Sequence, residues 1–234
     1  MAAIAAEIQY RSIIDIGTDH AYIPIYTCQN GLTDRAIACD INPGPLEIAK
    51  KNINNFGLNK MIETRLCSGF DAVKPGEAEC AVIAGMGGGL IIDIIKNAHN
   101  VVQALNSLIL QPQLDIPSVR RYIHLVGYRI TKECLVEDAS KFYNVIVCEK
   151  GEDASYTEAE YIIGKKLIES HSETFEKYLR KQLVSLEKIK SNIKNAEGGL
   201  ENSGKQRFQE IQSLIKMHNE ILDSTMEVDY GSKY

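Results

Sequence analysis

The chain has 234 residues, of which 44% are hydrophobic and 24% are charged. This composition is near the average of a soluble globular protein, and it excludes disordered, collagen-like and low-complexity chains. The 26 lysines and arginines are outnumbered by 31 aspartates and glutamates, which excludes a globally basic nucleic-acid binder, so any contact with RNA must come from a local patch.

Up to about Lys150, short apolar runs alternate with stretches of helical pattern. Continuous apolar strands separated by helices are typical of a parallel sheet that is covered on both faces. The last two strands follow each other without a helix, which predicts an antiparallel hairpin at one edge. The sequence therefore predicts a doubly wound α/β sheet of seven strands. The predicted strands are Ser12–Gly17, Arg35–Asp40, Met61–Leu66, Cys80–Ala84, Ser107–Gln111, Tyr128–Val136 and Tyr143–Glu149, and the predicted helices are Ala21–Asn30, Pro45–Phe56, Leu90–Ala98 and Ser118–Val126.

From about Ala154 the pattern changes, and apolar residues recur at three- and four-residue spacing in two stretches that a glycine-containing segment separates. This spacing predicts an α-helical hairpin with a narrow apolar seam, similar to a short antiparallel coiled coil. We therefore expect two domains, residues 1–153 and residues 154–234. The seam residues are Leu179, Leu183, Leu186, Ile189 and Ile193, then Phe208, Ile211, Ile215 and Leu222, and the predicted turn runs from Gly198-Gly199 to Gly204.

The hairpin carries ten lysines and arginines against six glutamates between Lys165 and Arg207. A solvated helix face and a phosphate-binding face both account for this excess, because cationic side chains on a long helix can follow an RNA backbone. The candidate RNA-binding residues are Lys177, Arg180, Lys181 and Lys188.

The six cysteines form no Cys-x-x-Cys pair and no short cluster with histidine, so the sequence predicts neither a zinc site nor a redox-active dithiol. Most of them lie in apolar strand-like runs, where a free thiol behaves as a small hydrophobic group. No apolar run approaches the roughly 18 residues of a membrane span, and the run at residues 2–6 is too short for a signal peptide. We expect a metal-free protein of the cytoplasm.

The first predicted strand ends in Asp15-Ile16-Gly17-Thr18-Asp19-His20. A glycine turn between a strand and a helix lets the backbone approach a nucleotide-like ligand, although such turns are more often purely structural. Only Gly17 of the dinucleotide-binding pattern G-x-G-x-x-G is present, so a pyrophosphate cradle lacks its glycines. A nicotinamide-dependent oxidoreductase is therefore disfavoured.

The second predicted strand ends in Asp40, which Ile41 follows. A carboxylate at this place can accept hydrogen bonds from both hydroxyls of a ribose, or it can cap the following helix. Two acids after successive strands, with Ala49 and Asn52 in the next helix, resemble a class I S-adenosylmethionine methyltransferase. The cofactor of that class carries a sulfonium and an amino group, which carboxylates suit better than a phosphate-binding turn would.

The third and fourth predicted strands are also followed by candidate binding segments. Class I methyltransferases often place an aspartate near the position of Ser68, where it accepts a hydrogen bond from the amino group of the cofactor's adenine. The hydroxyl of Ser68 accepts more weakly, and Cys67-Ser68 is equally compatible with an ordinary loop. After the fourth strand, Ala84-Gly85-Met86-Gly87-Gly88-Gly89 offers bare backbone that a flat base can approach, or forms a purely structural turn.

Four motifs in this order resemble the bacterial tRNA adenine-22 N1-methyltransferase family, often called TrmK. They are residues 15–24 (DIGTDHAYIP), 42–45 (NPGP), 84–88 (AGMGG) and 108–112 (LILQP). The resemblance implies a class I methyltransferase domain, a C-terminal helical domain, and transfer of a methyl group from S-adenosylmethionine to N1 of an adenine in the D-arm region of tRNA. The chain departs from the family at residues 67–70, where Cys-Ser-Gly-Phe replaces the usual Gly-Asp-Gly-Leu.

The resemblance also suggests roles for particular residues. Asp19 is the first candidate to accept a hydrogen bond from N6 of the target adenine, or else it holds the amino group of the cofactor. Gln111 and the backbone around Gly87 would position the base, and His20 would bind the cofactor or tRNA unless its role is structural. The candidate cofactor-binding residues are Asp15, Gly17, His20, Asp40, Ile41, Ser68, Gly69, Ala84, Gly85 and Met86.

Two other functions stay open on the sequence alone. One is a methyltransferase of the same fold with another substrate, and the other is a catalytically silent RNA- or protein-binding module. Ser68 favours the silent module, whereas Asp15, Gly17 and Asp40 oppose it. The expected partner is tRNA, and the sequence implies no membrane, no metal and no obligate protein partner.

Overall fold

The computed structural model describes residues 1–195 and 202–231. Its backbone contacts divide the chain into two compact units, Met1–Tyr156 and Thr157–Tyr234. The division falls three residues beyond the boundary expected from the sequence. No helix in the described ranges is both long and apolar enough to cross a membrane.

The first unit contains one seven-stranded sheet with the strand order β3-β2-β1-β4-β5-β7-β6. Strands β1 to β5 are parallel to one another, and β7 lies antiparallel to both β5 and β6. The predicted doubly wound α/β sheet with an antiparallel edge is therefore confirmed. The strands are β1 (Ser12–Ile16), β2 (Arg35–Asp40), β3 (Ile62–Leu66), β4 (Cys80–Gly87), β5 (Ser107–Leu114), β6 (Tyr128–Asp138) and β7 (Lys141–Lys150).

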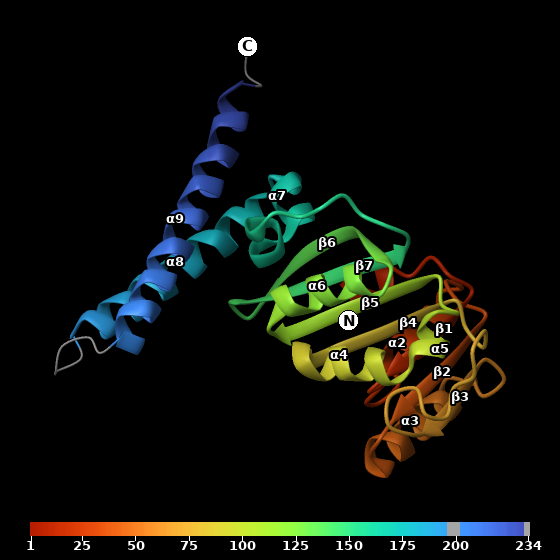
Figure 1. The fold of residues 1–234 in the computed structure, drawn as a ribbon. Coiled ribbons are helices and arrows are strands. Elements are labelled where there is room, and N and C mark those ends of the chain that lie inside the picture. The colour runs from red at the N-terminus through yellow and green to blue at the C-terminus, as the bar shows by residue number, and fades with distance from the viewer. Residues whose placement is uncertain (196–201, 232–234) are drawn as a thin grey trace. The chain divides into compact units, whose positions relative to one another are not determined.

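Helices cover both faces of this sheet, and for this reason its central strands are apolar throughout rather than alternating. All five residues of β1 are buried. One face packs against the first three helices and the other against the next three (Figure 1). The helices of the first face are α1 (Ala2–Ala6), α2 (Tyr22–Gln29) and α3 (Pro43–Asn55), and those of the second are α4 (Gly88–Asn97), α5 (His99–Val102) and α6 (Ile116–Leu125).

Several boundaries differ from the sequence prediction. Helix α3 begins at Pro43 instead of Pro45, because Asn42 in extended conformation precedes it as the N-cap. Strand β4 continues through the glycine turn to Gly87, with register shifts against β5 on both sides of Met86. The short helices α1 and α5 were not predicted, since four or five residues are too few to show a helical period.

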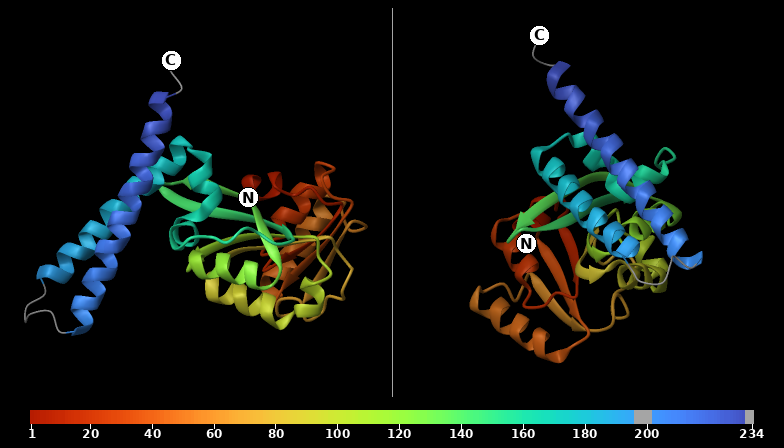
Figure 2. Two further views of the ribbon diagram at one scale, coloured as in Figure 1. Left: turned by 45° about the horizontal axis from the view of Figure 1, so that its top comes forward. Right: turned by 90° about the vertical axis from the view of Figure 1, so that its left-hand side faces the viewer.

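The second unit is helical, with elements η1 (Glu160–Gly164), α7 (Lys165–Ser170), α8 (Glu173–Asn195) and α9 (Asn202–Gly231). Helices α8 and α9 run side by side in opposite directions (Figure 2). Their shared core consists of Leu186, Ile211 and Ile215, with Leu183, Ile193 and Leu214 packed against it. The predicted helical C-terminal domain is confirmed, and supercoiling of the pair stays a prediction.

The predicted turn between these helices is wrong at its C-terminal end. Gly198 and Gly199 lie outside the described residues, whereas Gly204 lies inside α9, two residues after the helix begins. A glycine costs a helix only about 1 kcal/mol relative to alanine, so the helical residues after Gly204 outweigh its preference for a turn.

Candidate active site

The carboxyl ends of β1, β4 and β5 meet at one edge of the sheet, where a cavity of about 500 Å³ opens. Seven of the sequence-predicted site residues line it, namely Asp15, Gly17, Asp19, Ala84, Gly85, Met86 and Gln111. The others are not among its lining residues: His20, Asp40, Ile41, Ser68, Gly69 and Gly87. The structure therefore joins the turns after β1 and β4 in one hollow, and it leaves Asp40 and Ser68 beside that hollow.

The β1–α2 turn has an unusual backbone over a short stretch. Gly17 has φ = +71°, and the N–H groups of Gly17 and Thr18 both donate to the carbonyl of Cys39, at 2.9 Å each. Asp19 and Ala21 also have positive φ, at 41° and 60°, which is uncommon for residues with a Cβ. Such backbone outliers concentrate at ligand-binding sites, and this turn borders the cavity.

Asp15 is the buried acid of the site, with only 3% of its surface exposed. Burial raises the pKa of Asp15 to about 7, and a 2.6 Å hydrogen bond from the Thr18 hydroxyl partly offsets that effect. The neighbouring Asp40 and Asp19 carboxylates contribute to the same rise. A cation in the cavity would stabilise the ionised form of Asp15.

Asp40 ends β2 and is held by backbone N–H groups on both oxygens. Its Oδ1 accepts from Asn42 at 2.8 Å, and its Oδ2 accepts from Asp19 at 3.4 Å. The carboxylate thus joins the turns after β1 and β2. It bonds to the N-cap residue of α3 and to none of the helix's own N–H groups, so it does not act as the N-cap of that helix. Ile41 beside it is exposed.

The segment after β3 lies against Asp40. The N–H of Cys67 donates to the Asp40 carbonyl at 2.9 Å, and the Cys67 thiol donates to the carbonyl of Gly69 at 3.4 Å. Gly69 has φ = +52°, and a Cβ there would lie 3.2 Å from Ile94. The Ser68 side chain is exposed, so its hydroxyl is accessible to a ligand next to Asp40.

Gln111 of β5 lines the cavity, and the oxygen of its side-chain amide is already hydrogen-bonded within the protein. Its Oε1 accepts from the N–H of Gly85 at 2.9 Å, and Gly85 has φ = +77°. Its Nε2 is buried and has no hydrogen-bond partner among the described residues. A buried donor without a partner is costly, so a ligand with an acceptor atom fits this position. Gly87 is the N-cap of α4.

His20 lies in the β1–α2 turn. Its Nε2 lies 3.4 Å from Asp19 Oδ1, and its ring contacts Tyr22 edge to face at 5.5 Å. The His20 carbonyl accepts a 3.0 Å hydrogen bond from Asn52 of α3. The Nδ1 of His20 is buried and has no partner in the described part of the chain. Asn52 therefore ties α3 to the β1–α2 turn.

The sequence prediction missed the wall of the cavity that lies over β6 and β7. Val136 and Asp138 of β6, Tyr143 and Val145 of β7, and residues of α1 line it together with Gln111. These residues belong to no local motif. They lie beside Gln111 only because β7 inserts between β5 and β6, so no local sequence pattern predicts them.

The four candidate RNA-binding residues are exposed on α8 in the second unit. Lys177 pairs with Glu173 and Arg180 pairs with Glu176, each at 2.7 Å and one helical turn away. Lys181 and Lys188 are seven residues apart, which is close to two helical turns, so they lie on one face of α8.

A seven-stranded Rossmann-like sheet with carboxylates near the carboxyl ends of β1 and β2 and a glycine turn at the end of β4 defines a class I S-adenosylmethionine-dependent methyltransferase. The family described as tRNA (adenine(22)-N(1))-methyltransferase matches residues 13–220, and the chain belongs to this family.

Individual relatives agree with this assignment. The chain is 33% identical over 214 residues to the Bacillus subtilis protein named tRNA (adenine(22)-N(1))-methyltransferase, and the match covers 89% of each chain. The crystal structure of the B. subtilis m1A22 tRNA methyltransferase TrmK superposes with a TM-score of 0.85 at 30% identity, covering 94% of this chain and 96% of that one. M. capricolum TrmK in complex with S-adenosyl-homocysteine gives 0.82 at 31% identity, covering 95% and 96%.

Proposed function

We propose that this protein transfers the methyl group of S-adenosylmethionine to N1 of adenine 22 in tRNA, and that the reaction takes place in the cavity at the ends of β1, β4 and β5. Membership of the family supports the reaction. The observation that carries the site is the pairing of a buried acid, Asp15, with a buried unsatisfied donor, Gln111 Nε2, on the same cavity. The cofactor supplies an electrophilic methyl group, which the in-plane lone pair of a neutral adenine N1 accepts without a strong base.

The residues along β1 to β4 fit S-adenosylmethionine. The positive φ of Gly17 favours glycine in this turn, and the Met86 methyl group lies 2.3 Å from the position that a Cβ on Gly17 would occupy. Asp15 supplies the carboxylate for the cofactor's cationic end, and Asp40 supplies acceptors for the ribose hydroxyls. The N–H of Cys67 donates to the Asp40 carbonyl, and we assign the exposed Ser68 and the backbone of Gly69, which follow Cys67 in the chain, to the cofactor's adenine.

The remaining wall of the cavity suits the target base. Val136, Val145 and Tyr143 offer an apolar surface, against which a flat adenine can pack once it has left its stack. Gln111 Nε2 donates to a ring nitrogen other than the reacting N1. We assign Asp19 to the N6 amine, because Asp15 already supplies a carboxylate for the cofactor, and a carboxylate there stabilises the positive charge that the ring acquires.

The helical unit is assigned to the tRNA body. Lys177, Arg180, Lys181 and Lys188 present cations along α8 that can contact phosphates without reading sequence. Because the proposed substrate is tRNA, we assign the enzyme to the cytoplasm. The six free cysteines agree with a reducing compartment.

The test is methyl transfer from labelled S-adenosylmethionine to unmodified tRNA that carries adenine at position 22, with the same tRNA carrying guanine there as the matched control. We expect label only in the adenine substrate, recovered as 1-methyladenosine. Label in both tRNAs would contradict the assigned position. No label in either, with binding of S-adenosylhomocysteine retained, would mean a different substrate.

A further inference from the structure

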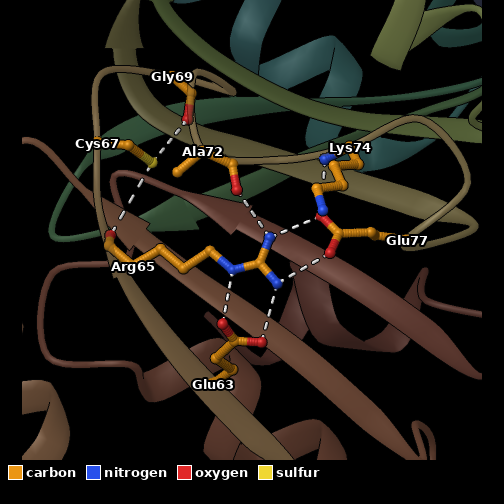
Figure 3. Close-up of polar contacts among 7 residues, drawn as sticks. All are labelled: Glu63, Arg65, Cys67, Gly69, Ala72, Lys74 and Glu77. Carbon is orange, nitrogen blue, oxygen red and sulfur yellow. Dashed lines mark hydrogen bonds and ion pairs between the residues drawn. The ribbon is translucent and has the colours of Figure 1, made fainter.

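The β3–β4 loop closes around a single guanidinium group. Arg65 of β3 uses all five of its N–H donors, as Figure 3 shows. Its Nε and Nη2 donate to the two oxygens of Glu63 at 2.8 and 2.9 Å. Its Nη1 and Nη2 donate to the two oxygens of Glu77 at 2.6 and 3.1 Å, and Nη1 also donates to the Ala72 carbonyl at 2.8 Å.

Only part of this network joins the loop to the sheet. Glu63 lies on β3, two residues before Arg65, so their pair connects a strand to itself. Ala72 and Glu77 lie in the loop, and Glu77 also accepts from the Lys74 N–H at 2.7 Å. The bonds from Arg65 to Ala72 and Glu77 therefore hold the distal part of the loop against β3.

Of the two carboxylates that bind Arg65, the one that holds the loop is also the less exposed. The Arg65 side chain is 16% exposed and Glu77 is 28% exposed, whereas Glu63 is 61% exposed. Water screens the Glu63 pair more strongly, so it contributes less. The pKa of Glu77 is lowered to about 2, first by the bidentate bond with Arg65 and then by the Lys74 N–H. Glu77 is thus the stronger anchor.

The first residues of this loop carry the contacts that we assign to the cofactor. Cys67 donates to the Asp40 carbonyl, and Ser68 and Gly69 follow directly. The loop is therefore held at both ends, at Asp40 by its backbone and at Arg65 by its distal part. A hydroxyl makes a weaker acceptor than a carboxylate, so a contact through Ser68 depends more on being held in place before the ligand arrives.

We infer that Arg65 and Glu77 are positioning residues for the adenosine end of S-adenosylmethionine, which hold the Ser68–Gly69 backbone beside Asp40. This inference rests on the proposed function of the site. Neither residue lines the cavity at the ends of β1, β4 and β5, in which we propose that the reaction takes place. Their effect is on cofactor affinity, with tRNA binding and the chemical step left intact.

The test compares Glu77→Gln with Glu63→Gln in the full chain. Both variants remove one carboxylate from Arg65, but only the first releases the loop. We expect Glu77→Gln to weaken binding of S-adenosylhomocysteine about tenfold by calorimetry, the scale of a lost charge-assisted bidentate pair. The KM for S-adenosylmethionine rises in parallel, while kcat at saturating cofactor and the KM for tRNA stay within about twofold. Glu63→Gln changes the affinity by less than about twofold, and Arg65→Lys behaves like Glu77→Gln because an ammonium lacks the planar fork.

Other outcomes distinguish a failure of this inference from a failure of the proposed function. Equal affinities for the two glutamine variants would overturn the inference and leave the proposed function standing. The same holds if Glu77→Gln lowers kcat and the melting temperature without a selective rise in the KM for S-adenosylmethionine. If the unaltered protein binds no S-adenosylhomocysteine, the proposed function fails and the inference fails with it.

Discussion

At the residue scale, the site depends on one acid that is kept in an unfavourable environment. Asp15 is buried beside the Thr18 hydroxyl, and the two nearest carboxylates, Asp40 and Asp19, oppose its ionisation. A carboxylate in this position costs stability when it is charged and no ligand is bound. The same charge is what a cationic cofactor needs, so we expect stability and cofactor affinity to oppose each other at this residue.

The prediction for Asp15→Asn follows from the pKa. The folded protein holds the proton of Asp15 up to about pH 7, whereas the ordinary value is 3.8, so ionisation destabilises the fold increasingly as the pH rises between these values. The variant lacks this penalty. We expect it to melt several degrees above the unaltered protein at pH 8, with the difference vanishing near pH 4, and to bind S-adenosylhomocysteine at least about tenfold more weakly.

Thermal melts followed by circular dichroism at pH 4.5 and pH 8 provide the measurement. Asp93→Asn, at an exposed position on α4, is the control and should show no pH-dependent difference. A melting difference for Asp15→Asn that is the same at both pH values would show that the raised pKa is not the cause.

At the element scale, the junction of β4 and α4 shows why the glycines of one motif are not equivalent. Gly85 is needed for its φ of +77°, which turns its N–H toward Gln111. Gly88 is needed for space, because a Cβ there would lie 2.6 Å from the Leu114 carbonyl oxygen. A Cβ on Gly89 would meet no atom within 4 Å. The end of β5 therefore packs directly on the first turn of α4.

Alanine substitutions should separate these cases. Gly88→Ala forces α4 away from β5, and we expect a loss of about 1–3 kcal/mol in the free energy of unfolding together with reduced methyl transfer. Gly89→Ala, one residue on, should stabilise the helix by about 0.5–1 kcal/mol. Urea denaturation of both variants measures the difference. Equal free energies of unfolding would show that the close approach at Gly88 is relieved without cost.

At the scale of the whole molecule, the net charge has the same sign as the expected substrate, tRNA. The chain has a net charge of −5, so its overall field repels a polyanion such as tRNA. Binding must then depend on local cations, and α8 presents Lys181 and Lys188 on one exposed face. The helical unit can be tested for this role without disturbing the cavity, whose lining residues all belong to the first unit.

The double charge reversal Lys181→Glu/Lys188→Glu should weaken tRNA binding about tenfold or more. Each lost phosphate contact should reduce the slope of log affinity against log salt by about 0.7–0.9. Filter binding between 50 and 200 mM salt measures both quantities. The control is Arg35→Glu/Lys60→Glu, which makes the same change in net charge at the amino ends of β2 and β3. If the two double variants lose affinity equally, binding responds to net charge and α8 is not the contact.

Much of the fold and part of the site could be predicted because they depend on local order. The buried strands are continuous apolar runs, and Asp15 and Asp40 lie within the last two residues of β1 and β2. Parallel strands place such residues at the same edge whatever the rest of the chain does. The end of the predicted turn at Gly204 was wrong for the opposite reason, since a local glycine preference of about 1 kcal/mol competes with a long helix.

The sequence by itself determined the fold class, the order of the motifs and the family, since each of them depends on short local segments with a fixed spacing. Only the tertiary structure decided which residues share a cavity. Tyr143 and Val145 reach Gln111 because β7 inserts between β5 and β6, and Arg65 meets Glu77 because the β3–β4 loop folds back on the strand. These contacts join residues that are distant along the chain or separated by a loop that has no hydrophobic periodicity. Their geometry depends on tertiary packing, which a local sequence pattern does not predict.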